Sequence, residues 1–291
     1  MPETAGSAKS GRTIRTTSQP LQRVSAETKD RDSSFVMASY HIHPYYELYY
    51  VERGACRFFI DNELYDLHEG DFLLIPPRTP HYTRYLFGDC RRSCLFFRDQ
   101  DLESAARNAL PSLQAVSPEK NTPSMDIFSA PASYRPQFEQ FFRRLSSEDQ
   151  IQDERSEDMS HYILQEFLLS CGRYCQFQGK SPANIHTGDR QILDAARYMS
   201  AHFREPVNAE MIAAAAGFSP NYFSRRFKEA TGMRVHEYLV LLRLKSAALE
   251  LLSTNDSITE IALRNGFSDS NYFKDAFKKM YGISPRAYRS R

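Results

Sequence analysis

Two stretches in the last third of the chain repeat each other at an offset of 50 residues. The segment GFSPNYFSRRFKEATG, residues 217–232, returns after one inserted residue as GFSDSNYFKDAFKKMYG, residues 266–282. An Asn-Tyr-Phe run, a Phe-Lys pair and a closing Gly all match, which indicates two copies of one supersecondary unit. The repeat limits the possible folds strongly, because this part of the chain must form the same small unit twice.

The local sequence of each copy favours a helix-turn-helix. A short first helix is predicted to end at Gly217 or Gly266, which can supply the positive φ of a tight turn. Ser219 and Ser268 are predicted to cap the second helix of each unit, and the glycine that closes each repeat stops that helix. Ser257-x-x-Glu260 is a capping box, which predicts the start of the first helix in the second copy.

Helical geometry divides each second helix into a buried and an exposed face. Two pairs of phenylalanines four residues apart, Phe223 with Phe227 and Phe273 with Phe277, are predicted to be buried. On the opposite face, Arg and Asn can read base edges in the major groove, Asp can accept from cytosine, and Lys suits phosphate. Ordinary solvated positions are the alternative, and the recurrence of this face in both copies favours DNA. The predicted DNA-binding residues are Asn221, Ser224, Arg225, Lys228, Ser270, Asn271, Lys274, Asp275 and Lys278.

The distribution of charge agrees with a nucleic-acid partner. The whole chain of 291 residues has a net charge of +1. Residues 186–291 carry 16 Lys and Arg against 11 Asp and Glu, so this part has a net charge of +5 and the rest of the chain −4. Such an asymmetry suggests binding to nucleic acid, although a solvated surface of mixed charge would look similar.

Residues 186–291 resemble the C-terminal DNA-binding domain of the AraC/XylS transcriptional regulators. The second copy, IALRNGFSDSNYFKDAFKKMYGISPRAYR, is very close to the signature of that family. The resemblance implies two helix-turn-helix units joined by a helix around Val240 to Leu252, with each recognition helix entering one of two successive major-groove segments. The family usually has a proline after the first recognition helix, as at Pro285 in the second copy, whereas this chain has Val235.

The N-terminal two thirds have a different pattern. Residues 1–33 are polar and lack periodicity, which predicts a disordered tail. Short runs rich in Tyr, Phe, Val and Ile then alternate with turns from residue 35 to 98, as in an antiparallel sandwich or barrel. We therefore expect a sensing domain over 34–130. Two helical stretches follow, and we assign 131–185 to a dimerisation and linker segment before the DNA-binding domain of 186–291.

The stretch HIHPYYELYYVERG, residues 41–54, resembles the first cupin motif, and Gly70-x5-Pro76-x4-His81 resembles the second. Arg78 and Tyr85 replace the usual Gly and Asn of the second motif. The resemblance supports a double-sheet jelly-roll. The predicted fold class is thus α+β in two domains, with an N-terminal cupin-like jelly-roll barrel and a C-terminal all-α double helix-turn-helix domain.

The polar residues of the predicted barrel are compatible with two kinds of ligand, a metal ion or a small organic effector. Three His and one Glu could hold Zn, Fe or Mn, as they do in metal-dependent cupin enzymes. Sensor domains of AraC type often keep the same residues while binding a small organic effector without a metal, and the attached DNA-binding domain favours this alternative. We therefore predict no metal, no cofactor and no catalytic residue. The predicted effector-binding residues are His41, His43, Glu47 and Tyr49, which share one face of a predicted strand, and His81 of the second motif.

The sequence thus predicts a DNA-binding transcription regulator controlled by a sugar or another small polar metabolite. The alternatives are a metal-dependent cupin enzyme fused to DNA-binding helices, and an effector-independent regulator whose barrel is only a dimerisation scaffold. The expected partners are double-stranded operator DNA, the effector and a second copy of the chain, with contact to RNA polymerase left open. Five unpaired cysteines, the absence of an apolar leader and the absence of a membrane span predict a cytoplasmic protein with no membrane partner.

Overall fold

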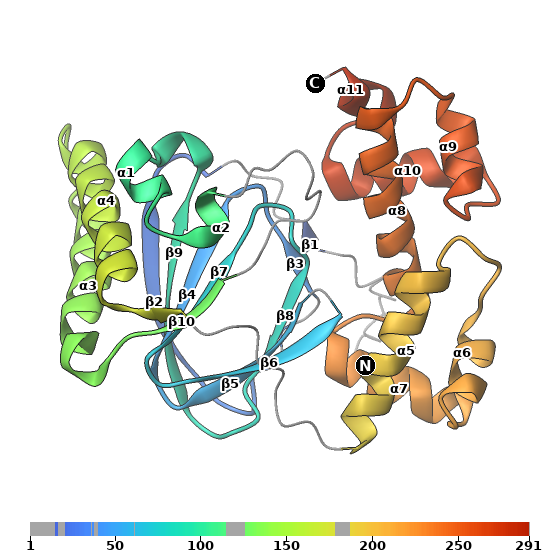
Figure 1. Cartoon of the computed structure of the whole chain (residues 1–291), viewed down its shortest axis with the longest axis horizontal. Helices are drawn as coiled ribbons and strands as arrows, with labels where there is room; N and C mark the ends of the chain where they lie inside the picture. The colour runs from blue at the N-terminus through green and yellow to red at the C-terminus, as the bar shows by residue number, and fades with distance from the viewer. Residues whose placement is uncertain are drawn as a thin grey trace, which may run out of the picture.

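The N-terminal part of the chain folds into two packed β-sheets (Figure 1). The computed structural model describes residues 15–16, 21–35, 37, 40–60, 62–114, 126–177 and 187–290. In spatial order, the first sheet contains β1 (Arg15–Thr16), β3 (His41–Ile42), β8 (His81–Arg84), β5 (Ala55–Ile60) and β6 (Glu63–His68). The second sheet contains β11 (Gln176–Phe177), β10 (Asp126–Ser129), β7 (Asp71–Ile75), β4 (Tyr46–Arg53), β9 (Cys90–Phe97) and β2 (Ser25–Arg31).

Helices cover the outer face of the second sheet. The longest of them are α3 (Arg135–Ile151) and α4 (Ser156–Tyr174), which lie side by side in Figure 1. Phe138, Phe142 and Phe167 of these helices pack on Tyr50 and Phe72 of the sheet in one apolar cluster. The shorter elements on this side are η1 (Asp99–Asp101), α1 (Ser104–Arg107), α2 (Pro111–Gln114) and η2 (Ala132–Tyr134).

The C-terminal part of the chain is helical and contains both predicted helix-turn-helix units. The first unit is α6 with α7, the second is α9 with α10, and α8 connects them (Figure 1). Phe223, Phe227, Phe273 and Phe277 are completely buried, as predicted from their spacing. The helices are α5 (Thr187–His202), α6 (Ala209–Ala215), α7 (Pro220–Thr231), α8 (Val235–Ser253), α9 (Ile258–Arg264), α10 (Ser270–Tyr281) and α11 (Pro285–Arg289).

The C-terminal helices pack against the outer face of the first sheet. Consequently β5 is buried along its whole length. Phe58 and Ile60 point between the two sheets, whereas Phe59 points outward and contacts Tyr238 of α8, with ring centres 6.0 Å apart. Side chains alternate across a strand, so one strand contributes both to the barrel interior and to the contact with the DNA-binding helices.

The prediction of a disordered tail over residues 1–33 is wrong for residues 15–16, which form β1, and for residues 25–31, which form the edge strand β2. This strand pairs with β9 over seven residues, from Ser25 opposite Phe96 to Arg31 opposite Cys90. Its sequence is mostly polar, so hydrophobic periodicity could not reveal it. Backbone pairing and ion pairs such as Glu27 with Arg92 hold the strand in place. Residues 1–14 and 17–20 of the predicted tail lie outside the described residues.

The prediction of a single strand from His41 to Tyr49 is also wrong. The chain leaves the first sheet after Ile42 and enters the second sheet at Tyr46, with Pro44 exposed between them. Proline has no N–H for a strand ladder, so the break falls where the sequence allows it. The structure nevertheless places His43 and Glu47 in the interior, because both sheets face the same core.

Most of the helix boundaries in the repeat follow the sequence signals. The capping box of Ser257 and Glu260 is formed, and Gly232 and Gly282 end their helices at φ of 75° and 77°. The predicted cap at Ser268 is wrong by one residue. The carboxylate of Asp269 accepts hydrogen bonds from the backbone N–H groups of Asn271 and Tyr272, at 3.1 and 3.0 Å.

We predict that Asp269→Ala lowers the thermal unfolding midpoint, because two N–H groups at the start of α10 lose their acceptor. The same backbone hydrogen bonds, from Tyr272 and Asn271, lower the pKa of Asp269 from its ordinary value of 3.8. The stabilisation by a carboxylate with a lowered pKa is complete above the ordinary value and is lost as the pH falls below it. The difference between wild type and variant, measured by circular dichroism, should therefore shrink below pH 3.8. Ser268→Ala is the matched control, and an equal loss in both variants would contradict the assignment.

Candidate functional site

Three of the predicted effector-binding residues converge inside the barrel. Nε2 of His43 lies 2.9 Å from Oε2 of Glu47, and Nε2 of His81 lies 3.4 Å from the same oxygen. His43, Glu47 and His81 expose only 5, 8 and 3% of their surface. Each comes from a different place in the fold, because His43 follows β3, Glu47 is on β4 and His81 begins β8. We call these three residues the barrel cluster.

Backbone contacts determine which ring nitrogens of the barrel cluster carry hydrogen. Nδ1 of His43 lies 2.8 Å from the carbonyl oxygen of Tyr45, and Nδ1 of His81 lies 3.0 Å from that of Thr79. A carbonyl oxygen only accepts, so each Nδ1 is the donor. In neutral rings both Nε2 atoms would then present lone pairs to the carboxylate of Glu47, which also only accepts. A hydrogen atom or a cation must therefore lie between these atoms, either a proton shared by a ring nitrogen and the carboxylate or a bound metal ion.

The charge state of Glu47 agrees with this requirement. Burial alone would raise the pKa of Glu47. The hydrogen bonds and charges of His43 and His81 outweigh burial and hold the pKa well below its usual value. A buried carboxylate that stays ionised is stable only beside compensating positive charge.

The structure separates the other two predicted residues from this centre and adds one that the sequence did not suggest. The ring of His41 lies beside His81, at 6.1 Å between ring centres, while the hydroxyl of Tyr49 lies 3.2 Å from that of Tyr85. The thiol of Cys94 donates to Oε1 of Glu47 at 3.2 Å. Alternation along the strand could have placed this cysteine inside, but nothing local identifies its partner on a distant strand.

The barrel cluster has a donor set that fits a divalent metal ion. One ligand atom from each of the three residues lies within 4.8 Å of the others. Two imidazoles and one carboxylate suit Zn²⁺, Fe²⁺ or Mn²⁺. Metal-binding histidines usually donate their second ring nitrogen to a carbonyl or carboxylate, as both histidines do here. By contrast, four cavities of about 350 to 820 Å³ in the described part of the chain are all lined by other residues than the predicted effector-binding ones.

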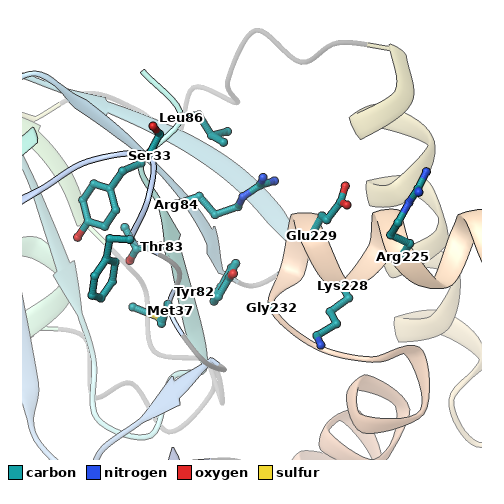
Figure 2. Close-up of a pocket in the computed structure, with 12 residues that line it drawn as sticks. Ser33, Met37, Tyr82, Thr83, Arg84, Leu86, Arg225, Lys228, Glu229 and Gly232 are labelled. Carbon is teal, nitrogen blue, oxygen red and sulfur yellow. The ribbon is translucent and has the colours of Figure 1, made fainter. Parts of the chain in front are cut away.

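The predicted DNA-binding residues lie on the outer faces of α7 and α10. Lys228 and Ser270 are half-buried, and the other seven are exposed. The two faces differ in their surroundings. On α7, Arg225 and Lys228 line a cavity whose other wall is the barrel, shown in Figure 2. Among the described residues, no helix has both the length and the apolar character needed to cross a membrane.

Comparisons with known proteins agree with both halves of the structure. Residues 28–164 match the model of the AraC-like ligand binding domain, and residues 212–291 match that of a helix-turn-helix domain. The chain belongs to the AraC family of helix-turn-helix transcriptional regulators. It is therefore a DNA-binding regulator with a ligand-binding domain, and the family consists of regulators rather than enzymes.

Similarity to individual relatives extends over different lengths. The chain is 24% identical over 250 residues to the transcriptional activator RhaS of an Enterobacter species, covering 86% of each chain. It is 33% identical over 101 residues to an uncharacterised regulator of Staphylococcus aureus, which covers 35% of this chain but only 14% of that protein. The DNA-binding domain of AdpA, solved with a target DNA, is 30% identical over 34% of this chain and 90% of that domain, with a TM-score of 0.33.

Arg78 stands where the second cupin motif usually has a glycine, and its backbone conformation explains why glycine is usual at this position. Its φ is 60°, a left-handed conformation that costs most residues about 1–2 kcal/mol. Its N–H donates to the carbonyl oxygen of His43 at 2.7 Å, which ties this turn to the barrel cluster. Its guanidinium lies 6.0 Å from the ring centre of Tyr288 in α11.

We predict that Arg78→Gly is more stable than Arg78→Ala by about 1 kcal/mol. Both variants lose the contact with Tyr288, but only glycine also relieves the left-handed backbone. Urea unfolding of the two variants measures the difference. Equal stability, or a more stable alanine variant, would show that this backbone conformation is not strained.

Proposed function

We propose that this regulator reads its operator through the exposed faces of α7 and α10, using the nine residues predicted above. The supporting observation is that equivalent residues of the two copies are buried or exposed in the same way. In both helices the Phe pair is buried, while Asn221 and Asn271 at equivalent positions are exposed. Two such helices on one rigid connector suit successive segments of the major groove.

Replacement of Arg225 or Asn271 by Ala is predicted to weaken operator binding by roughly 1–3 kcal/mol with a much smaller effect on unrelated DNA. The DNA would be a fragment selected by the protein from genomic DNA, and fluorescence anisotropy would compare it with a scrambled duplex. Asn255→Ala, an exposed asparagine between α8 and α9, is the control. If both variants kept the wild-type ratio of the two affinities, the assignment of these faces would be wrong.

We infer further that a ligand held inside the barrel regulates DNA binding. A polar metabolite such as a sugar would meet His41, His43, Glu47 and His81 at the end of the barrel. The apolar side chains that fill the rest of the interior, such as Phe58, Ile60 and Leu73, limit how large such an effector can be. Regulation requires that the ligand bind two arrangements of the chain with different affinity.

A divalent cation is the second candidate for this ligand, because such an ion would satisfy the lone pairs that face each other in the barrel cluster and its three donors require no cavity. We predict that the chelator-treated protein binds about one Zn²⁺ per chain and gains roughly 2–3 kcal/mol of stability at 100 times the dissociation constant. His43→Ala should weaken binding at least about tenfold, one ligand of three being lost. Calorimetry and thermal unfolding measure both effects.

The control for this experiment is His68→Ala, because His68 is exposed at the end of β6. Absence of Zn²⁺, Fe²⁺ and Mn²⁺ binding to the wild type would leave the barrel cluster as a protonated polar network. Equal binding to the wild type and the His43→Ala variant would place the ion elsewhere.

A homodimer is the oligomeric state that we propose. Helix α4 buries Phe167 against the second sheet but exposes Met159, Tyr162 and Leu169, by 44, 66 and 44%. These three lie at helical spacing on one side of α4, away from the barrel. Exposed apolar side chains grouped in this way suit a contact with a second copy. Contact with RNA polymerase stays open.

A further inference from the structure

Two cysteines from opposite sheets meet in the interior of the barrel. Cys56 is on β5 in the first sheet, and Cys90 begins β9 in the second. They expose 0 and 1% of their surface and belong to one apolar cluster. Neither is part of the barrel cluster, and all five cysteines of the chain are free thiols.

The backbone segments that carry the two cysteines are in close contact. A Cβ atom at Gly54, where the chain turns from β4 into β5, would lie 2.1 Å from the carbonyl oxygen of Asp89 and 3.2 Å from Cα of Cys90. Cys56 follows Gly54 by two residues, and its side chain lies between the two sheets. A disulfide joins Cα atoms about 4.4–6.8 Å apart, so only strands that approach this closely can be bridged.

The thiols of Cys56 and Cys90 share a hydrogen bond. Burial and then this bond raise the pKa of Cys56 well above its usual value, whereas the same bond lowers the pKa of Cys90. The charge of Arg92 lowers the pKa of Cys90 further. Cys56 is therefore the proton donor of the pair, and Cys90 has the thiolate character that reacts with an oxidant.

The other three cysteines are less suited to pair with Cys90. Cys94 is four residues further along β9, and at about 3.4 Å per residue its Cα lies about 13 Å away, beyond the roughly 7 Å that a disulfide can span. Its thiol instead accepts from the guanidinium of Arg92 at 2.9 Å. Cys171 and Cys175 are at the end of α4, on the outer side of the second sheet.

Cys90 is also close to solvent, although its side chain is buried. Residues 86–89, which directly precede it, are all exposed. Local opening of an exposed loop needs much less free energy than global unfolding, and it admits a molecule as small as hydrogen peroxide. Cys90 can therefore react while the barrel stays folded, with Cys56 in contact to react next.

We propose that hydrogen peroxide converts Cys56 and Cys90 into a reversible disulfide that links the two sheets and alters DNA binding. The thiolate of Cys90 first attacks the peroxide. A sulfur–oxygen bond forms, the O–O bond breaks, and the hydroxide that leaves takes up a proton, which gives a sulfenic acid and water. The sulfur of Cys56 then attacks the sulfur of Cys90, and the S–S bond replaces the sulfur–oxygen bond. The second hydroxide leaves with the proton of Cys56, so two thiols are oxidised and one peroxide is reduced to two waters.

Strand β5 connects this disulfide to the DNA-binding helices. Arg57, the neighbour of Cys56, donates to Asp189 of α5 at 3.0 Å, and Phe59 contacts Tyr238 of α8. A bond that draws Cys56 towards β9 displaces the strand that makes both contacts. The effect on DNA binding rests on this connection, whereas the formation of the disulfide does not.

The first experiment maps the disulfide in the full chain. Trypsin separates all five cysteines, and it places Cys56 in the peptide 54–57 and Cys90 in the peptide 85–91. After treatment with hydrogen peroxide, the remaining thiols are blocked with N-ethylmaleimide, and the monomer is digested and analysed by mass spectrometry. We expect these two peptides to be cross-linked, and dithiothreitol to separate them.

Serine variants identify the role of each cysteine. In Cys56→Ser the sulfenic acid of Cys90 persists and is labelled by dimedone, whereas in Cys90→Ser the label on Cys56 should be much weaker. Cys175→Ser removes the one cysteine that is not buried and is the matched control, which should keep the cross-link. Equal labelling of both variants would overturn these roles. A wild type that lacks the link between 54–57 and 85–91, or links other cysteines in its place, would overturn the redox pair whether or not the variants fold.

The second experiment compares the operator affinity of the reduced and the oxidised wild type by fluorescence anisotropy. The two affinities should differ about fivefold or more, and dithiothreitol should restore the reduced value. Peroxide should leave the affinity of Cys90→Ser unchanged. Equal affinities of the reduced and the completely cross-linked wild type would overturn the effect on DNA binding.

Discussion

The buried side chain of Arg57 joins the two halves of the molecule. It exposes only 7% of its surface, and its guanidinium donates two hydrogen bonds to Asp66, at 2.6 and 2.8 Å, and one to Asp189, at 3.0 Å. A buried guanidinium is stable only when all its charge is compensated. Asp189 belongs to the first turn of α5, and its second oxygen accepts from Arg226 of α7 at 3.0 Å. The first recognition helix is thus two ion pairs from the barrel.

The strands β5 and β8 also connect the two halves, because each has side chains buried on both of its faces. The proposed ligand inside the barrel would meet His81, and the next residue, Tyr82, lies against Gly232 at the end of α7. A change in the position of β8 therefore reaches the recognition helix without any intervening element. Coupling between sites requires a difference in ligand affinity between two arrangements, and here the shared element would be a single strand. The ring of Tyr82 packs directly on Gly232, so a shift of β8 would displace the end of α7.

The C-terminal helices were predictable from sequence because their signals are local. The repeated glycines, the Phe pairs and the capping box act within one or two helical turns, and each is found where the sequence indicates it. The cap of α10 was displaced from Ser268 to Asp269 because neighbouring polar residues compete for the same N–H groups. The barrel was predictable as a class, but not in detail. Edge strand β2 is held by a distant strand, and Cys94 meets Glu47 across 47 residues of sequence. Such partners have no local signature.

The two recognition helices differ in a way that the repeat conceals. The polar face of α10 is exposed at Asn271, Lys274, Asp275 and Lys278, whereas Arg225 and Lys228 of α7 line a cavity that residues of the barrel also line, and Lys228 is half-buried. A helix that enters the major groove, about 12 Å wide, needs that face open to base edges. If the barrel regulates DNA binding, as proposed, the packing of Tyr82 on Gly232 gives it a direct contact with the first unit, and Arg78 beside Tyr288 gives it a contact with the helix that follows the second unit.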